Sequence, residues 1–329
     1  ERTAARRDAG HPEPFEAPLW SAGPGADWDI GTLETLNPAV HTIERFESFF
    51  SGNNGVSGGL GDAPAHQTAR TLSIRHFFSQ CAPEIIGKDR HDMYCVGLSR
   101  FKTDLDRCVA TMAARFGANA PKIALREWGV WHGEASKENG LEQPNSLSDA
   151  LVAASMFNLL NDNAEHISHA VMAQAINALQ CLVVTEGPDM FLTPNYHVVD
   201  MMAPHRGARR LCHRLDTPEM EVAETPGAPK EKMPTLSVSA SRVGKRVCIT
   251  VVNRSYGETI PVSVEIREAG IVEVTGRLLH AESVTSENSV DAPKNVTPRW
   301  IKLIPDGNTF HDTLPPHSFA AYNVTLGQG

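Results

Sequence analysis

The chain has 329 residues, of which 41% are hydrophobic and 21% are charged, a composition typical of a globular protein with more than one domain. The formal net charge of −9 argues against nucleic acid or an anionic membrane as a partner. No apolar run approaches the roughly 20 residues that a membrane span requires.

The six cysteines are scattered and match neither a zinc site nor a redox pair. The chain opens on a polar stretch rather than on a signal peptide. Scattered free thiols fit a reducing compartment. We therefore expect a cytoplasmic protein.

In the first 204 residues, strand candidates alternate with segments of helical spacing. Strands are expected at 15–22, 40–50, 122–127 and 167–173, and helices at 27–36, 67–86, 98–116, 146–160 and 196–203. This alternation predicts a parallel sheet covered by helices. A complete (β/α)8 TIM barrel needs eight strands and about 250 residues. The sequence therefore predicts half of such a barrel.

Two details refine this interpretation. An apolar stripe in the helix expected at 98–116 is predicted to be core, and it contains Phe101, Leu105, Cys108, Val109 and Met112. The glycine-rich loop at 51–65 matches no phosphate-loop spacing, so no nucleotide cofactor is expected.

After residue 204 the apolar pattern changes to a period of two. Strands are expected at 236–240, 247–251, 262–266, 301–303 and 318–324. Such alternation is typical of an antiparallel β-sandwich. We expect a domain boundary between residues 204 and 205, and an exposed joining loop at 217–234, which is rich in Pro and Glu.

The candidate for chemistry is Ile123-Ala-Leu-Arg-Glu127-Trp-Gly-Val-Trp131. A carboxylate at the carboxyl end of a parallel strand is how barrel enzymes present a catalytic acid. Tryptophan rings stack on sugars as readily as on core side chains. The alternative is a strand end with a solvated Glu127 and core tryptophans.

These residues also resemble glycoside hydrolase family 51, the retaining α-L-arabinofuranosidases. The resemblance continues through 138–150, 172–177, 192–200 and 314–318. It implies that residues 1–204 form strands five to eight of a TIM barrel, and that residues 205–329 form a jelly-roll-like β-sandwich. It further implies an exo-acting glycosidase that removes arabinofuranose from oligosaccharides, without a cofactor, and that forms a homo-oligomer when intact.

The resemblance also assigns roles. Glu127 corresponds to the nucleophile, Trp131 shapes the sugar subsite, and Gln174 hydrogen-bonds the furanose, with Asn177 as a weaker candidate. The family's acid/base is a Glu in an Asn-Glu pair on the fourth barrel strand. No such pair precedes residue 15. We therefore expect a fragment that lacks its acid/base and is inactive alone.

Three positions depart from the family pattern. Arg126 stands where the family has Asp. Glu47-Ser-Phe49 is aligned with the family's His-x-Tyr of the sixth strand, which places Glu47 and Phe49 among the candidate substrate-binding residues. Because Phe49 has no hydroxyl to hold the nucleophile, a non-catalytic sugar-binding or scaffold homologue stays open. A related glycosidase for another sugar is a third possibility.

No catalytic or metal-binding role is predicted for the other titratable residues of this region. Glu134, Glu138 and Glu142 are expected to be solvated loop carboxylates. His166 and His169 have no third ligand in pattern with them, so no metal site is predicted.

Overall fold

The computed structural model describes residues 58–60, 71–79, 85–120, 122–267 and 269–327. Several predictions lie outside these residues: the strands at 15–22 and 40–50, the helix at 27–36, and the candidates Glu47 and Phe49. They stay predictions.

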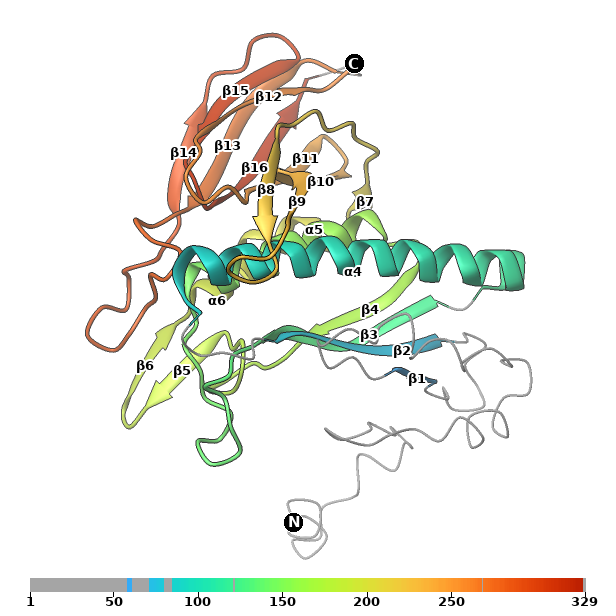
Figure 1. The fold of residues 1–329 in the computed structure, drawn as a ribbon. Coiled ribbons are helices and arrows are strands. Elements are labelled where there is room, and N and C mark those ends of the chain that lie inside the picture. Colours follow the sequence, from blue (N-terminus) through green and yellow to red (C-terminus); the bar gives the residue numbers. More distant parts are fainter. Residues whose placement is uncertain (1–57, 61–70, 80–84, 121, 268, 328–329) are drawn as a thin grey trace, which may run out of the picture.

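The first sheet is mostly parallel (Figure 1). Its order is β1-β2-β3-β4, with bounds Gly58–Leu60, Thr71–Ser79, Lys122–Trp131 and Ile167–Met172. Strand β3 pairs in parallel with both β2 and β4, whereas β1 is antiparallel to β2. The strands expected at 122–127 and 167–173 are thus confirmed.

The helix expected at 67–86 was wrong, because Thr71–Ser79 forms strand β2. This segment is rich in β-branched and aromatic residues, which pack well in a pleated sheet. Its pairing with β3 along the whole segment decides the conformation. A pattern of apolar residues in such a short stretch does not reveal that partner.

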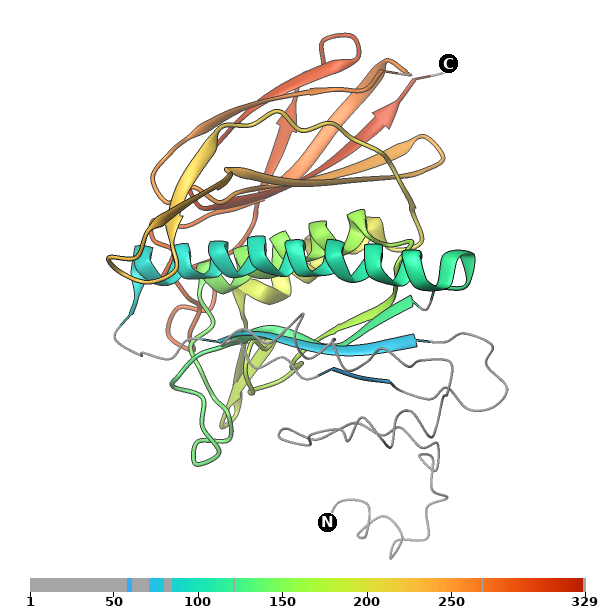
Figure 2. The same ribbon diagram turned by 45° about the vertical axis from the view of Figure 1, so that its right-hand side comes forward.

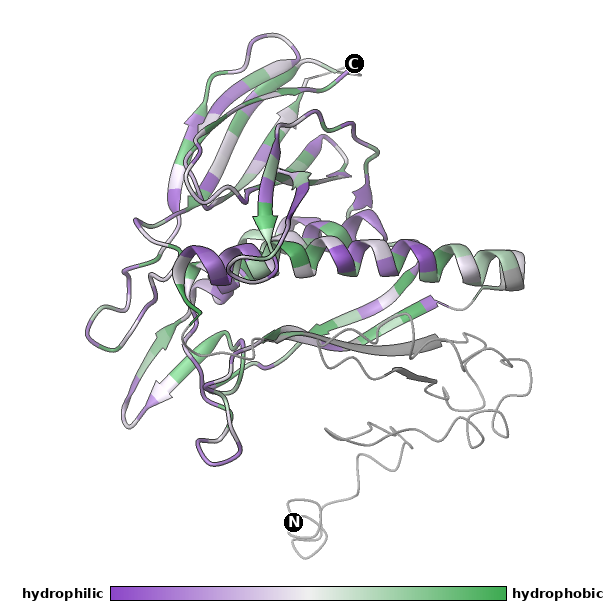
Figure 3. Cartoon of the chain, viewed as in Figure 1, coloured by the Kyte–Doolittle hydropathy of each residue, from purple (hydrophilic) through white to green (hydrophobic). Residues whose placement is uncertain are grey.

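Three helices cover one face of the parallel sheet, namely α4 (Gly87–Phe116), α5 (Leu147–Asp162) and α6 (Pro194–Met201). The predicted helices at 98–116, 146–160 and 196–203 are confirmed, although α4 begins at Gly87. The predicted apolar stripe of α4 is core, since Phe101, Leu105, Cys108 and Met112 are all buried. Hydrophilic and hydrophobic residues alternate along α4 (Figure 3), as expected of a helix with one buried face. Short 3-10 turns follow at Gly117–Asn119 and Ala203–His205.

Antiparallel sheets make up the C-terminal part. Six strands run in the order β14-β13-β16-β11-β10-β7, with bounds Arg299–Leu303, Ile271–Leu279, Ser318–Leu326, Arg246–Asn253, Leu236–Val243 and Arg209–Arg210. A two-stranded sheet pairs β12 (Ile260–Glu265) with β15 (Thr309–Leu314). All five strands expected here are present, and β7, β13 and β15 were missed.

The exposed loop expected at 217–234 is instead largely a hairpin of β8 (Glu219–Ala223) and β9 (Lys230–Pro234). Val222 and Met233 are buried against Cys95 and Val96 of α4. The hairpin is fixed because its apolar face packs on the helix, which the Pro- and Glu-rich composition concealed. A second hairpin, β5 (Val183–Glu186) with β6 (Asp189–Leu192), follows β4.

The helices lie between the parallel sheet and the antiparallel strands (Figures 1 and 2). One core cluster joins Trp128 of β3, the buried face of α5, and Phe319 and Ala321 of β16. On the opposite face of the six-stranded sheet, Tyr322 packs against Phe310 of β15, with ring centroids 5.1 Å apart. No helix among the described residues is long and apolar enough to cross a membrane.

Candidate active site

Glu127 lies within β3, which continues to Trp131 instead of ending at Glu127. The backbone of Glu127 is in register with Arg75 of β2. Trp128 is fully buried on the helix side, where its ring meets that of Phe157 edge-on at 5.1 Å. Because successive strand residues point to opposite faces, the half-buried Glu127 carboxylate lies on the face away from the helices.

Trp131 is half-buried at the carboxyl end of β3. Its ring packs in a small cluster with Ala135, Leu141, Ala173 and Leu179. The indole Nε1–H donates a hydrogen bond to the carbonyl of Ala135 at 3.2 Å. These contacts fix the plane of the ring and leave part of it accessible.

Gln174 follows β4, and its side chain is exposed. The preceding residue, Ala173, donates its N–H to the carbonyl of Trp128 at 2.9 Å and touches the Trp131 cluster. The structure therefore brings Gln174 and Trp131 to the same edge of the sheet.

The side chain of Asn177 stabilises the loop after β4. Its φ of 60° is left-handed, and its side chain binds both the main chain and the hydroxyl of Thr185 on β5. The Asn177 amide thus ties the loop after β4 to the following hairpin, and its polar atoms are engaged there.

A buried glutamine holds the carboxyl end of β3. Gln180 Oε1 accepts the N–H of Val130 at 2.8 Å, and its Nε2 donates to the carbonyl of Asp149 at 2.6 Å and to Asn195 Oδ1 at 2.9 Å. A Cβ on Gly129 would lie 3.1 Å from both Gln180 Oε1 and the carbonyl oxygen of Ala173. Glycine at position 129 is what lets this glutamine approach the strand.

A second part of this network surrounds His132. The imidazole Nε2 lies 3.0 Å from Asp149 Oδ1, and both side chains are fully buried. Tyr94 of α4 places its hydroxyl 3.3 Å from the other ring nitrogen. Asp149 Oδ2 also accepts the N–H of Ser146 at 2.7 Å and so caps the start of α5.

Two further amides complete the network. Gln143 accepts the N–H of His132 at 3.0 Å and donates to the carbonyl of Val130 at 3.1 Å. Asn195 donates to Asn145 Oδ1 at 2.9 Å, and Asn145 donates to the carbonyl of Leu179 at 3.2 Å. The motifs at 138–150 and 192–200 therefore supply supports for the end of β3. The sequence analysis did not predict this supporting role. The amide residues within these two motifs, such as Gln143 and Asn195, were the only local sign of it.

The loop carboxylate of Glu134 is not solvated as predicted. Glu134 is half-buried and forms an ion pair with Arg90 of α4 at 3.1 Å, so the prediction of a solvated side chain was wrong. Arg90 is itself buried and also donates to the carbonyl of Ile85. Glu138 and Glu142 are exposed, as expected.

Three buried cysteines keep their thiols protonated near neutral pH. Burial raises the pKa of the Cys95 and Cys108 thiols to about 12 and that of Cys181 to about 11. Within the described part of the chain, no three His, Cys, Asp or Glu side chains are grouped as metal ligands. The carboxyl edge of the sheet carries the Trp131 indole and the Gln174 amide, and Glu127 lies four residues before Trp131 on β3.

The fold of the chain is similar to that of solved family 51 arabinofuranosidases. The structure of the family 51 arabinofuranosidase from Xanthomonas axonopodis pv. citri matches with a TM-score of 0.71 and 26% identity, over 78% of this chain and 52% of that one. The enzyme from Thermotoga petrophila shows the same fold at a TM-score of 0.64 and 21% identity, over 98% of this chain and 69% of its own.

Residues 127–318 match the family described as the α-L-arabinofuranosidase C-terminal domain. The chain belongs to this family, that of the glycoside hydrolase family 51 α-L-arabinofuranosidases. It is 28% identical over 185 residues to an intracellular exo-α-L-arabinofuranosidase of Bacteroides ovatus, and it spans 35% of that protein's length. A Bifidobacterium longum exo-α-(1→6)-L-arabinofuranosidase is 23% identical over 97% of this chain and 68% of its own length.

Proposed function

We propose that the chain forms the nucleophile-bearing part of a retaining, exo-acting α-L-arabinofuranosidase, with Glu127 as the nucleophile. The observation that carries this proposal is the position of Glu127 on β3. Its carboxylate lies on the sheet face away from the helices, four residues before Trp131. Gln180 and Gln143 accept the N–H groups of Val130 and His132, and Gln143 also donates to the carbonyl of Val130, which holds the strand end in place.

A rigid strand end matters for this chemistry. In a retaining mechanism the nucleophile attacks the anomeric carbon while a second carboxyl group protonates the leaving oxygen, and the two carboxyls lie about 5–5.5 Å apart. Small displacements of such groups are costly in rate. The network beneath β3 fixes the backbone on which Glu127 is carried.

In this proposal Trp131 contributes the apolar wall of the sugar subsite and Gln174 a hydrogen bond to the furanose. Both lie at the carboxyl edge of the sheet, where parallel-barrel enzymes bind substrate. Asn177 is a weaker candidate, because Thr185 already engages its amide.

The strand pairing favours another equivalent of the family's sixth strand. The strand that pairs with β3 is β2, and it carries His76-Phe77-Phe78, closer to the family's His-x-Tyr than Glu47-Ser-Phe49 is. We therefore propose β2, and not residues 40–50, as the equivalent of the family's sixth strand. Phe78 is buried on the helix side near Phe101, at 6.5 Å between ring centroids, so its ring lies on the sheet face opposite to the Glu127 carboxylate.

The proposal also includes the domain architecture of the chain. Residues up to 204 form part of a (β/α)8 barrel and residues from 205 form a jelly-roll-like β-sandwich. The chain spans about half of the Xanthomonas chain, and the proposal assigns the proton-donating carboxyl to a barrel strand outside these 329 residues. It further assigns arabinofuranosyl oligosaccharides as substrates, a homo-oligomer as the working form, and a cytoplasmic location, which the intracellular relative from Bacteroides ovatus supports.

The decisive experiment measures release of p-nitrophenol from an aryl α-L-arabinofuranoside by the longest natural form of the protein. Glu127→Gln should lower kcat by roughly 10³-fold or more, because the covalent intermediate cannot form. Azide should restore turnover in Glu127→Ala by replacing the missing nucleophile. The matched control is Glu138→Gln, an exposed carboxylate of the following loop that should keep full activity. Undiminished turnover by Glu127→Gln would remove the proposal.

A non-catalytic sugar-binding homologue is the second candidate, and Arg126, which stands where the family has Asp, favours it. Calorimetry with arabino-oligosaccharides separates the two functions. Binding without turnover by the longest form supports the sugar-binding protein, and turnover excludes it. A panel of aryl glycosides tests the further alternative of a different sugar.

A further inference from the structure

Two arginines face each other across the edge of the six-stranded sheet. Arg209 of β7 and Arg242 of β10 are direct partners in the antiparallel ladder. Like charges directly opposite each other on neighbouring strands are destabilising. The two arginines therefore repel each other at the edge of the sheet, and neutral residues at these two positions would remove that repulsion.

Neither arginine is neutralised within the described residues. Arg242 is half-buried, and its Nε donates to the carbonyl of Gly244 at 2.6 Å, which leaves its terminal nitrogens unbonded there. Arg209 is exposed and forms no ion pair with the carboxylates that the structure describes. Arg210 differs, because its guanidinium lies 3.6 Å from Glu165.

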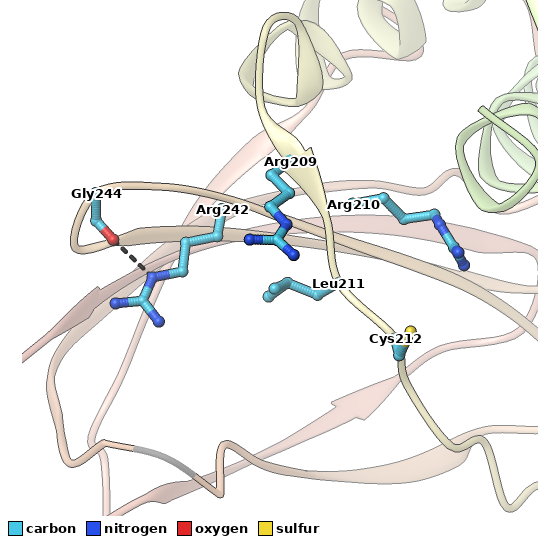
Figure 4. A pocket seen from close by; sticks show the side chains of 6 residues that line it. All are labelled: Arg209, Arg210, Leu211, Cys212, Arg242 and Gly244. Atoms are coloured by element: carbon cyan, nitrogen blue, oxygen red, sulfur yellow. Dashed lines mark hydrogen bonds between the residues drawn. The ribbon is translucent and has the colours of Figure 1, made fainter. Parts of the chain in front are cut away.

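The pair lines a pocket. Its walls are Arg209, Arg210, Leu211, Cys212, Arg242 and Gly244. In Figure 4 the side chains of Arg209 and Arg242 extend to the same side, near Leu211, whereas Arg210 extends in the opposite direction. Leu211 is half-buried and held by its N–H bond to the carbonyl of Ala240 at 2.8 Å.

The surroundings add positive charge. Residues 205–215 and 236–257 contain no Asp or Glu, although the whole chain has a net charge of −9. Lys245 and Arg246 are exposed in the turn beside Gly244. An anion in the pocket would meet two guanidinium groups, whose planar donors match carboxylate and phosphate oxygens in bidentate fashion.

We propose that this pocket binds an oxyanion, either the phosphate of a small ester or the carboxylate of an acidic sugar. The helices separate β7 from the parallel sheet that carries Glu127 (Figure 1), so this is a site apart from the proposed catalytic one. The bound anion offsets the repulsion between Arg209 and Arg242 and joins β7 to β10.

Titration calorimetry at low ionic strength tests the proposal, with inorganic phosphate and galacturonate as separate probes. At least one probe should bind the wild type. Arg209→Gln and Arg242→Gln should each weaken that binding by about tenfold or more, the effect of losing one charge-assisted hydrogen-bond pair. Arg246→Gln is the control, because it removes the same charge from the same turn without touching the pocket.

The pattern of results identifies the ligand class. Phosphate binding alone indicates a phosphate ester, galacturonate binding alone an acidic sugar, and binding of both a general oxyanion site. No binding of either probe overturns the proposal, as does an equal loss in Arg246→Gln. Arg242→Lys keeps the charge and should still weaken binding, because lysine lacks the fork of donors. Every readout is binding, so failure here leaves the proposed hydrolase function untouched.

Discussion

The imidazole of His132 and the carboxylate of Asp149 lie 3.0 Å apart, and neither is accessible to solvent. His132 immediately follows β3, and Asp149 lies in the first turn of α5. The pair therefore joins the strand that carries Glu127 to the helix that covers it. Its contribution is to the position of the strand end, since neither group reaches the face on which Glu127 lies.

Replacing Asp149 with Ala should lower the free energy of unfolding by about 1–3 kcal/mol, the usual cost of leaving a buried hydrogen-bonding group, here the His132 ring, without its partner. The substitution also removes the acceptor for the N–H of Ser146 at the start of α5. Urea denaturation followed by circular dichroism measures the change. The exposed Asp106 of α4, replaced in the same way, should have almost no effect, and an equal loss there would contradict the argument.

Gln180→Leu should be destabilising by about 1–3 kcal/mol, because it leaves the buried N–H of Val130 without an acceptor. If the network positions Glu127, kcat of the longest form should fall while KM for an aryl arabinofuranoside changes little. Gln174→Leu, at an exposed position, should leave stability unchanged and raise KM. The same kinetic pattern in both variants would show that Gln180 has no positioning role.

Trp131→Ala should raise KM for the proposed sugar by about tenfold, the loss expected for an aromatic stacking contact with its buried area. It also removes packing against Ala135, Leu141 and Leu179. Trp131→Phe keeps most of that packing and an aromatic face, although it loses the bond to the carbonyl of Ala135. Steady-state kinetics on both variants, with melting temperatures, separates the two effects. An unchanged KM in Trp131→Ala would exclude a sugar subsite at this ring.

Stability should fall as pH drops from about 6.5 to about 4, in part because of His205. Burial lowers the pKa of His205 to about 4, and its ring nitrogens lie 2.7 Å from Ser241 Oγ and 3.0 Å from Thr250 Oγ1. The unfolded chain takes up this proton near pH 6.5 and the folded chain does not, so protonation favours unfolding. The contribution of His205 is at most about 3 kcal/mol over this range.

Denaturant melts between pH 7 and pH 4 test this prediction. His205→Gln should flatten part of the pH dependence, whereas the exposed His311→Gln should leave it unchanged. Burial also lowers the pKa of His91, so a residual slope of the same sign is expected in the His205 variant. An unaltered slope in His205→Gln would contradict the assignment.

Most of the fold could be predicted where the signal is local. The stripe of α4, the cap of α5 and the alternating strands β10, β11 and β16 each follow from residues close together in the chain. Strand β2 could not be recognised, because its conformation depends on pairing with β3 across a whole intervening helix. The β8–β9 hairpin was taken for a loop, because its apolar face packs on α4 and leaves charged residues in the majority.

The candidate site, like the fold, could be predicted from the sequence only in part. The sequence set apart Glu127 and Trp131 through an apolar strand segment that runs into a carboxylate and aromatic residues, and the resemblance to the family added Gln174. Only the tertiary structure showed that Gln180, fifty positions from Val130, completes the end of β3. It also showed that Arg90 holds Glu134 and that Arg209 opposes Arg242. Local spacing fixes helices and strands, but hydrogen bonds and charge pairs between distant residues exist only once the chain has folded.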